Sequence, residues 1–209
     1  MAYSNFSLAK VKQEFDLTIH EIPDLFADLK VVKPSKILTE LLQEYLPLAT
    51  AIGTEKARSE FLIAPILSEV RRQFNYQISL FSGTDFNVDF EKGLLGYCDF
   101  LISASPEQFF ISAPVITIVE AKNENIIGGL GQCIAEMLAA QMFNQRQEIE
   151  ISTIYGAVTS GTNWRFLSLT ENQVKIDLVE YYINQIEKIL GILLNPIQAY
   201  LSRVNLEKS

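Results

Sequence analysis

The sequence predicts an α/β protein in which helices flank a central mixed sheet. Three observations predict this class. Apolar residues repeat at helical spacing up to about residue 74, runs of aromatic and β-branched residues broken by glycine follow, and the chain closes on a long amphipathic pattern. A further helical stretch interrupts the strand runs near residue 130. This order is typical of a sheet covered by helices and not of a repeating, doubly wound one.

The composition indicates a single domain. The 209 residues are 48% hydrophobic and 20% charged, which is typical of a globular protein with a sizeable core. We expect one domain over 1–209, in which a helical segment (1–53) precedes the core and a long helix (180–204) ends the chain.

The first predicted elements are helical. The opening thirty residues predict an irregular segment with short helical pieces. Pro34 and Ser35 then make a suitable helix start, and Ile37, Leu41 and Tyr45 recur on one face of the helix that follows.

Residues 54–74 predict a second helix. Thr54 is a suitable N-cap, and Pro65 inside the pattern predicts a kink or a break. Glu60 lies at the edge of the apolar face of this helix, where it either reaches a site or faces solvent.

The rest of the chain predicts strands around one helix. Strand patterns, each bounded by turn residues, cover 76–83, 86–103, 108–112, 114–122, 151–161, 163–170 and 173–180. "GGLGQCIAEMLAAQMFNQ" predicts a helix entered through Gly128, Gly129 and Gly131. No phosphate-loop motif is present, so we interpret these glycines as a tight helix entry.

Charge and cysteine content narrow the function classes. The net charge is −8, from 17 basic and 25 acidic residues, which argues against a protein that coats nucleic acid through charge alone. Cys98 and Cys133 are too few for a disulfide framework, and we expect buried, reduced thiols. No apolar run reaches the roughly 18 residues of a membrane span, and the first residues lack a secretory pattern, so we expect a cytoplasmic protein without membrane contact.

The most informative stretch is "ITIVEAKNENIIGGLGQ", in which a buried-strand pattern ends in charge. Residues i and i+2 of a strand share a face, so Glu120 and Lys122 project together. Asp99 lies within the apolar run of a neighbouring strand, where a carboxylate needs a partner. If the two strands form a hairpin through the turn near Pro106, Asp99 and Glu120 meet at one end of the sheet. Two carboxylates that meet suit a hard cation, Mg²⁺ or Mn²⁺.

This constellation resembles the PD-(D/E)XK nuclease superfamily, which has the restriction-endonuclease-like fold. The matching features are Asp99, the next strand's Glu120-Ala121-Lys122, and a preceding helix that carries Glu60. The resemblance covers about residues 54–170, the nuclease-like core. Its most specific part, "EAKNENIIGGLGQCIAEM", is similar to the branch in which a helix glutamine joins the active site. Together with "TEKARSEFLIAPIL" it is similar to a bacterial, often cyanobacterial, group.

The resemblance also implies roles for individual residues. It implies a metal site formed by Asp99, Glu120, Glu60 and the backbone carbonyl of Ala121. It implies that Lys122 serves the attacking water, and that Glu60 and Gln132 support the site. Cys98 stands where the family motif has a proline, which weakens the motif more than the chemistry.

Each of these residues also has an ordinary structural interpretation. Glu120 and Lys122 together fit a solvated strand end, and Asp99 fits a turn cap or a partner of an arginine such as Arg165. Glu60 fits an exposed helix edge, and Gln132 fits a cap after the glycines.

Three functions therefore stay open. The first is a Mg²⁺-dependent nuclease that hydrolyses DNA, with DNA as partner and a homodimer as the form that makes two cuts. The second is a non-cleaving binding or regulatory subunit of the same fold, which the acidic charge favours. The third is an enzyme that acts on a small phosphorylated substrate.

Overall fold

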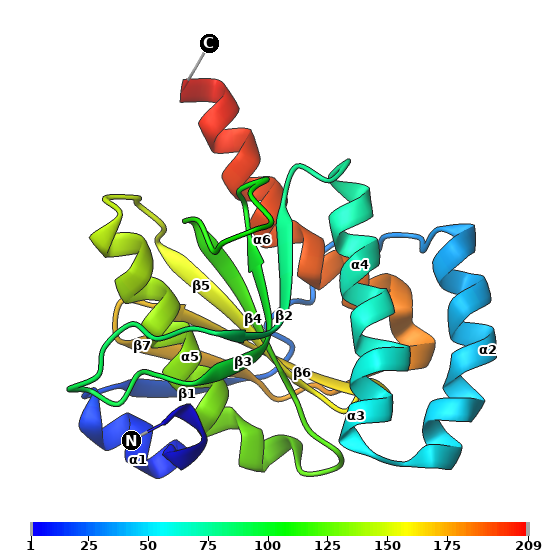
Figure 1. The fold of residues 1–209 in the computed structure, drawn as a ribbon, viewed down its shortest axis with the longest axis horizontal. Coiled ribbons are helices and arrows are strands. Elements are labelled where there is room, and N and C mark those ends of the chain that lie inside the picture. The colour runs from blue at the N-terminus through cyan, green and yellow to red at the C-terminus, as the bar shows by residue number, and fades with distance from the viewer. Residues whose placement is uncertain (1, 208–209) are drawn as a thin grey trace.

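The computed structural model describes residues 2–207 and confirms the α/β class (Figure 1). The described residues form one eight-stranded mixed sheet. Seven of its strands follow the order β1-β7-β6-β5-β4-β3-β2, and the eighth, β8, pairs with β6. The strands are β1 (Thr18–Ile22), β2 (Ser79–Asp85), β3 (Tyr97–Ser103), β4 (Val115–Ala121), β5 (Thr153–Thr159), β6 (Asn163–Thr170), β7 (Gln173–Asp177) and β8 (Tyr181–Tyr182).

The pairing of β4 with β5 is parallel, and this determines the topology around the site. A parallel neighbour requires a crossover connection, which α5 (Ile126–Arg146) supplies. β2, β3 and β4 form an antiparallel meander before the crossover, and β5, β6 and β7 form a second one after it.

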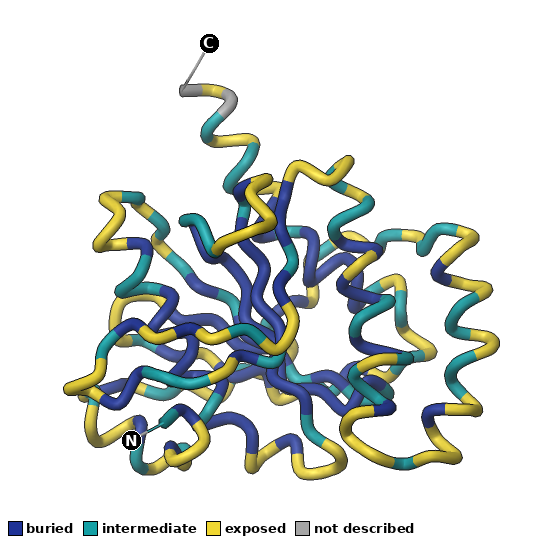
Figure 2. The backbone as a smooth tube through the Cα atoms, viewed as in Figure 1, coloured by how far each residue is buried: buried dark blue, intermediate teal, exposed yellow. Residues whose placement is uncertain are grey.

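Helices cover both faces of the sheet. α5 and α1 (Leu8–Glu14) pack on one face, on the left in Figure 1, and contribute to one apolar cluster. The other face carries α2 (Lys36–Ile52), α4 (Ala64–Gln73) and α6 (Ile186–Glu207), whose apolar residues form the second cluster. The central strands between these layers are buried along most of their length (Figure 2).

The burial of β4 follows from this two-sided cover. All seven residues of the strand are buried, and Ile118 and Val119 belong to the clusters on opposite faces. A polar side chain in this strand is therefore also buried, and Glu120 is one.

α5 is a core helix. By length and composition it could cross a membrane, but 67% of its most apolar window is buried inside the fold. A methyl group added at Gly131 would lie 2.3 Å from the carbonyl carbon of Ser7, so the glycine lets the backbone before α1 lie directly against the helix.

The N-terminal segment contains a strand that the sequence pattern did not predict. After a 3-10 turn (Tyr3–Asn5) and α1, β1 pairs in parallel with β7 at the edge of the sheet. The segment 1–53, for which short helical pieces were predicted, therefore contains a strand as well. Ser35 caps α2 as predicted, accepting a hydrogen bond from the backbone N–H of Leu38 at 3.2 Å.

The helix predicted over 54–74 is divided by a wider turn. Thr54 caps α3 (Glu55–Arg58), a π-helical turn follows (Ser59–Ile63), and α4 then begins with Pro65 in its first turn. The proline is tolerated there because the first turn of a helix needs no N–H donor from it.

The first part of one predicted strand, and the whole of another, are loops in the structure. Residues 86–96 form a loop whose only bridge pairs Asp89 with Leu94, and residues 108–112 lie in the connection between β3 and β4. Phe109 is fully exposed, so aromatic content alone was misleading there. At the end of the chain, β8 and a 3-10 turn (Ile183–Gln185) come before α6, which starts later than predicted.

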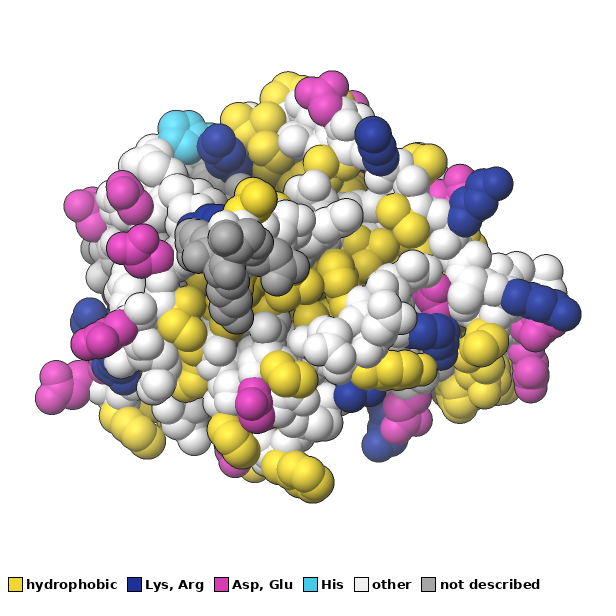
Figure 3. All heavy atoms as spheres, turned by 90° about the horizontal axis from the view of Figure 1, so that it is seen from above, with side chains coloured by type: hydrophobic (Ala, Val, Ile, Leu, Met, Phe, Trp, Pro, Cys, Tyr) yellow, Lys and Arg dark blue, Asp and Glu magenta, His cyan; other side chains and the backbone are white. Residues whose placement is uncertain are grey.

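The end of the sheet at which α6 terminates faces the viewer in Figure 3, with hydrophobic side chains gathered across its centre. A cavity of about 190 Å³ lies there and is lined by residues of β4, β5 and α6 and their flanks, among them Ile116, Ile151, Tyr155, Pro196, Ala199 and Tyr200. It lies at the opposite end of β4 from Glu120.

Candidate active site at the end of β3 and β4

The candidate site lies where β3 and β4 separate. Their register begins at Phe100 opposite Val119, whereas β3 also pairs with β2 back to Tyr97. The next step in this register places Asp99 opposite Glu120. The Oδ2 of Asp99 accepts the backbone N–H of Ala121 at 2.8 Å, so a side chain takes the place of a strand partner.

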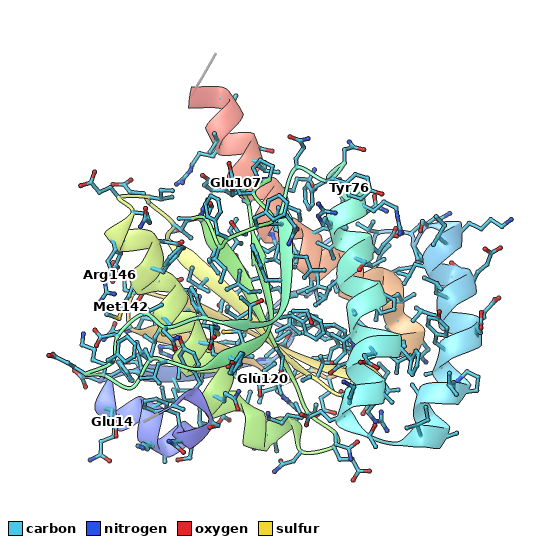
Figure 4. The ribbon with its side chains drawn as sticks, viewed as in Figure 1. Glu14, Tyr76, Glu107, Glu120, Met142 and Arg146 are labelled. Carbon is cyan, nitrogen blue, oxygen red and sulfur yellow. The ribbon has the colours of Figure 1, made fainter. Side chains whose placement is uncertain are left out.

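Glu120 is the most unusual residue of the site. It is fully buried at the end of β4, close to the first turns of α5 (Figure 4). Its Oε1 accepts a hydrogen bond from Nζ of Lys122, while its Oε2 is buried and has no hydrogen-bond partner within the described chain.

The electrostatic surroundings of Glu120 favour its neutral form when no cation is bound. Burial and then the neighbouring Asp99 raise the pKa of Glu120 to about 8, although Lys122 opposes this shift. Since a desolvated carboxyl next to a second carboxyl holds its proton tightly, a cation that replaces that proton would relieve the repulsion.

Lys122 follows β4 on the same face as Glu120, and its side chain is 24% exposed. Burial lowers the pKa of Lys122, but Glu120, Asp99 and Glu55 together outweigh burial and raise the pKa above its ordinary value. The Nζ atom also lies 3.5 Å from Oε1 of Gln132 on α5. The ammonium is therefore charged, held from two sides and still reachable from solvent.

The start of α5 is built to approach this lysine closely. Asn125 caps the helix by accepting the backbone N–H of Gly128 at 2.9 Å. A methyl group at Gly129 would lie 2.7 Å from Cγ1 of Val158 and 3.0 Å from Cγ of Lys122. Gly129 thus allows tight packing of the helix on the strands.

Glu136 is a member of the site that the sequence did not lead us to expect. It is fully buried on α5, its Oε1 accepts from Nε2 of Gln132 at 3.1 Å, and its Oε2 has no partner in the described structure. Burial and Glu120 raise its pKa well above the ordinary range. A glutamate four residues after Gln132, inside an otherwise apolar helix, was the signal that could have identified it.

Glu60 does not join this group. It is exposed on the π-helical turn, as the helix-edge interpretation expects, and pairs with Lys56 at 3.3 Å. Glu55, at the start of α3, is instead the glutamate of this region that acts electrostatically on Lys122.

Other residues singled out in the sequence lie in ordinary structural positions. Arg165 donates to Oε1 of Glu180 at 2.5 Å and to the backbone oxygen of Asp177, so it is not the partner of Asp99. Cys98 and Cys133 are buried and free, and burial raises the pKa of both thiols.

Side chains alone do not supply enough oxygen ligands for a hard cation at this site, so a backbone oxygen has to contribute. Across residues 2–207, no group of three or more His, Cys, Asp or Glu side chains is arranged to hold a metal ion. The N–H and C=O of a strand residue point toward the same neighbour, so the carbonyl of Ala121 faces the side on which its N–H meets Asp99. Asp99, the free Oε2 of Glu120 and this carbonyl together make an oxygen set suited to Mg²⁺, with waters to complete it.

Comparison of the chain with protein-family models, with curated proteins and with solved structures gives no match in any of the three.

Proposed function

We propose that the protein is a Mg²⁺-dependent nuclease of the PD-(D/E)XK type, with a restriction-endonuclease-like core, that hydrolyses phosphodiester bonds in DNA. The observation that carries the proposal is the unpartnered, buried Oε2 of Glu120 beside Asp99 and Lys122. Buried polar atoms without partners are rare, and a bound ion is one of the few ways to satisfy such an oxygen.

In this proposal Asp99, Glu120 and the carbonyl oxygen of Ala121 hold the metal ion. When bound, Mg²⁺ supplies positive charge that neutralises a phosphate group and lowers the pKa of a coordinated water. Without it the site offers a phosphate only the single ammonium of Lys122, beside the carboxyls of Asp99, Glu120 and Glu136.

Lys122 is the residue that faces the substrate. Its partly exposed ammonium donates hydrogen bonds, and one of its acceptors, Oε1 of Glu120, belongs to the proposed metal site. It can therefore orient the attacking water and stabilise charge that develops on the phosphate. A cytoplasmic location fits the two buried, free thiols.

The net charge of −8 favours one rival, a non-cleaving subunit of the same fold. Such a subunit would not need the cation, so metal binding separates the two functions.

The first test combines metal binding with cleavage. Purified protein is titrated with Mn²⁺ in a calorimeter and incubated with supercoiled, linear, single-stranded and branched DNA. We expect Asp99→Ala and Glu120→Ala to abolish Mn²⁺ binding, because each removes a ligand oxygen. Lys122→Met should keep Mn²⁺ binding and lose about 10²- to 10⁴-fold in cleavage rate, as expected when a proton-transfer or positioning group is lost.

The matched control is Lys36→Met, which removes a lysine that forms an exposed pair with Glu40 on α2. It should cut like the wild type. Wild-type protein that binds no Mn²⁺ and cuts no DNA would support the rival, and Lys122→Met that cuts normally would exclude the role given to Lys122.

A further inference from the structure

A continuous chain of hydrogen bonds connects the candidate site to the interior of α5. Nζ of Lys122 donates to Oε1 of Glu120 and lies 3.5 Å from Oε1 of Gln132. On the other side of the same amide, Nε2 of Gln132 donates to Oε1 of Glu136 at 3.1 Å. Because a glutamine amide has oxygen on one side and NH₂ on the other, the partner of one side determines what the other side presents.

Gln132 needs such a constraint. If its amide turned by 180°, the NH₂ group would face the ammonium of Lys122, and two donors would oppose each other. Glu136 accepts from the amide and cannot be exchanged for a donor when ionised. A carboxyl that carries its proton on Oε2 still accepts through Oε1, so the observed hydrogen bond fits both protonation states, while only the ionised form excludes the turned amide outright.

No other contact explains why a carboxyl occupies this position. Glu136 is fully buried, and within residues 2–207 its hydrogen-bond partner is Gln132, one helical turn away. The nearby donors are used elsewhere: the hydroxyl of Tyr3 donates to the carbonyl of Phe86, and the thiol of Cys133 lies 3.7 Å from the carbonyl of Ala157. Burying a carboxyl costs free energy that an apolar residue of similar size would avoid.

We propose that Glu136 is a positioning residue: it fixes the orientation of the Gln132 amide and thereby holds the ammonium of Lys122 in place beside Glu120. The expected effect on catalysis rests on the proposed nuclease function. The orientation of the Gln132 amide by Glu136 does not depend on that function.

The test compares Glu136→Met with the conservative Glu136→Gln. Methionine fills the space but cannot accept the amide, whereas the glutamine oxygen can. For Glu136→Met we expect kcat for DNA cleavage to fall about 10- to 100-fold, the loss typical of a supporting group behind an active site. KM and the dissociation constant for Mn²⁺ should stay within about threefold, and Glu136→Gln should recover kcat to within about threefold, since it restores the acceptor.

A second readout does not depend on activity. The side-chain NH₂ of Gln132 is followed by ¹⁵N–¹H NMR and by its exchange with solvent. We expect two separate, protected signals in the wild type and in Glu136→Gln, and loss of that protection in Glu136→Met. Gln141→Met is the control, because Gln141 lies further along the same helix and donates to the backbone oxygen of Glu171.

Three results would overturn the proposal. One is unchanged kcat in Glu136→Met, and another is unchanged Gln132 signals in that variant. The third is loss of Mn²⁺ binding in Glu136→Met, which would make Glu136 a metal ligand. If the wild type cuts no nucleic acid, the nuclease proposal fails, while the NMR readout still decides whether Glu136 orients the amide.

Discussion

At the scale of single residues, the site is defined by an excess of buried carboxyl groups over positive charge. Burial raises the pKa of Glu120 and of Glu136; Asp99 adds to the shift of Glu120, and Glu120 adds to that of Glu136. One ammonium, that of Lys122, lies among them. An arrangement of this kind disfavours the metal-free ionised state and so predisposes the site to bind a cation.

This imbalance predicts a pH-dependent stability. The pKa of Glu120 is about 8 in the folded protein against an ordinary value of 4.5, so between these values the folded state keeps a proton that the unfolded chain releases. The unfolding free energy of the metal-free wild type should therefore fall as pH rises from about 5 to 8, by at most about 1.4 kcal/mol per pH unit from this group. Glu120→Gln removes the titrating group and should remove this part of the slope.

The measurement is urea unfolding of both proteins in EDTA at three pH values across that range. We expect the stability advantage of Glu120→Gln over the wild type to widen with rising pH. Because Glu120 also raises the pKa of Glu136, the difference reports Glu120 together with its effect on Glu136. A gap that stays constant or narrows would show that Glu120 is ionised throughout.

At the scale of elements, periodicity predicted those that are long and covered on both faces. The apolar run of β4 was recognisable because every residue of the strand is buried. The long pattern of α6 was recognisable because its apolar residues recur at each turn and pack in the core. The pairing of Asp99 with the end of β4 also followed from strand geometry, because the β3–β4 connection is a simple antiparallel one.

The elements that were missed depend on distant parts of the chain. β1 alternates polar and partly buried residues at the edge of the sheet, and its partner β7 lies about 150 residues away, so no local pattern marks it.

Two glutamates were also placed differently by the structure. The position of Glu60 was predicted with an ideal helical period of 3.6 residues, but a π-helical turn at Ser59–Ile63 changes which residues share a face. Glu136 was overlooked because its role depends on a hydrogen bond to Gln132, which composition does not reveal.

The close packing of α5 gives a prediction at this scale. A methyl group at Gly131 would lie 2.3 Å from the carbonyl carbon of Ser7 and 2.4 Å from the carbonyl oxygen of Phe6. Both are backbone atoms that cannot rotate away. Gly131→Ala should therefore displace the N-terminal segment and cost about 1–3 kcal/mol of unfolding free energy, as overpacked cores do.

Hydrogen exchange of α1 and urea unfolding measure this effect. Gly128→Ala is the matched control, because the three atoms nearest to its new methyl group all belong to the side chain of Asn125. We expect faster exchange of the α1 amides in Gly131→Ala and not in Gly128→Ala. Equal exchange in the two variants would mean that the contact between α5 and the N-terminal segment can relax.

At the scale of the whole molecule, charge opposes the proposed substrate. With a net charge of −8, the protein repels DNA at long range, and attraction has to come from the ions at the site. Binding of DNA should therefore depend on divalent cations, unlike that of a basic protein.

This can be measured with the non-cleaving Lys122→Met variant and labelled DNA. In EDTA at physiological salt we expect affinity no better than nonspecific binding, with a Kd of about 10⁻⁴ M or weaker, and at least tenfold tighter binding in Mn²⁺. The double variant Asp99→Ala, Glu120→Ala should show no such gain. Equal affinity with and without Mn²⁺ would mean that a surface elsewhere on the molecule binds DNA.

The pairing of β1 with β7 has a consequence for the order in which the protein is made. Residues 18–22 leave the ribosome about 150 residues before their strand partner, residues 173–177. The strands and helix that carry residues 99–136 can come together well before that point, since they are close in sequence. During synthesis the region of the candidate site is thus expected to form first, while β1 keeps its backbone unpaired until β7 has been made.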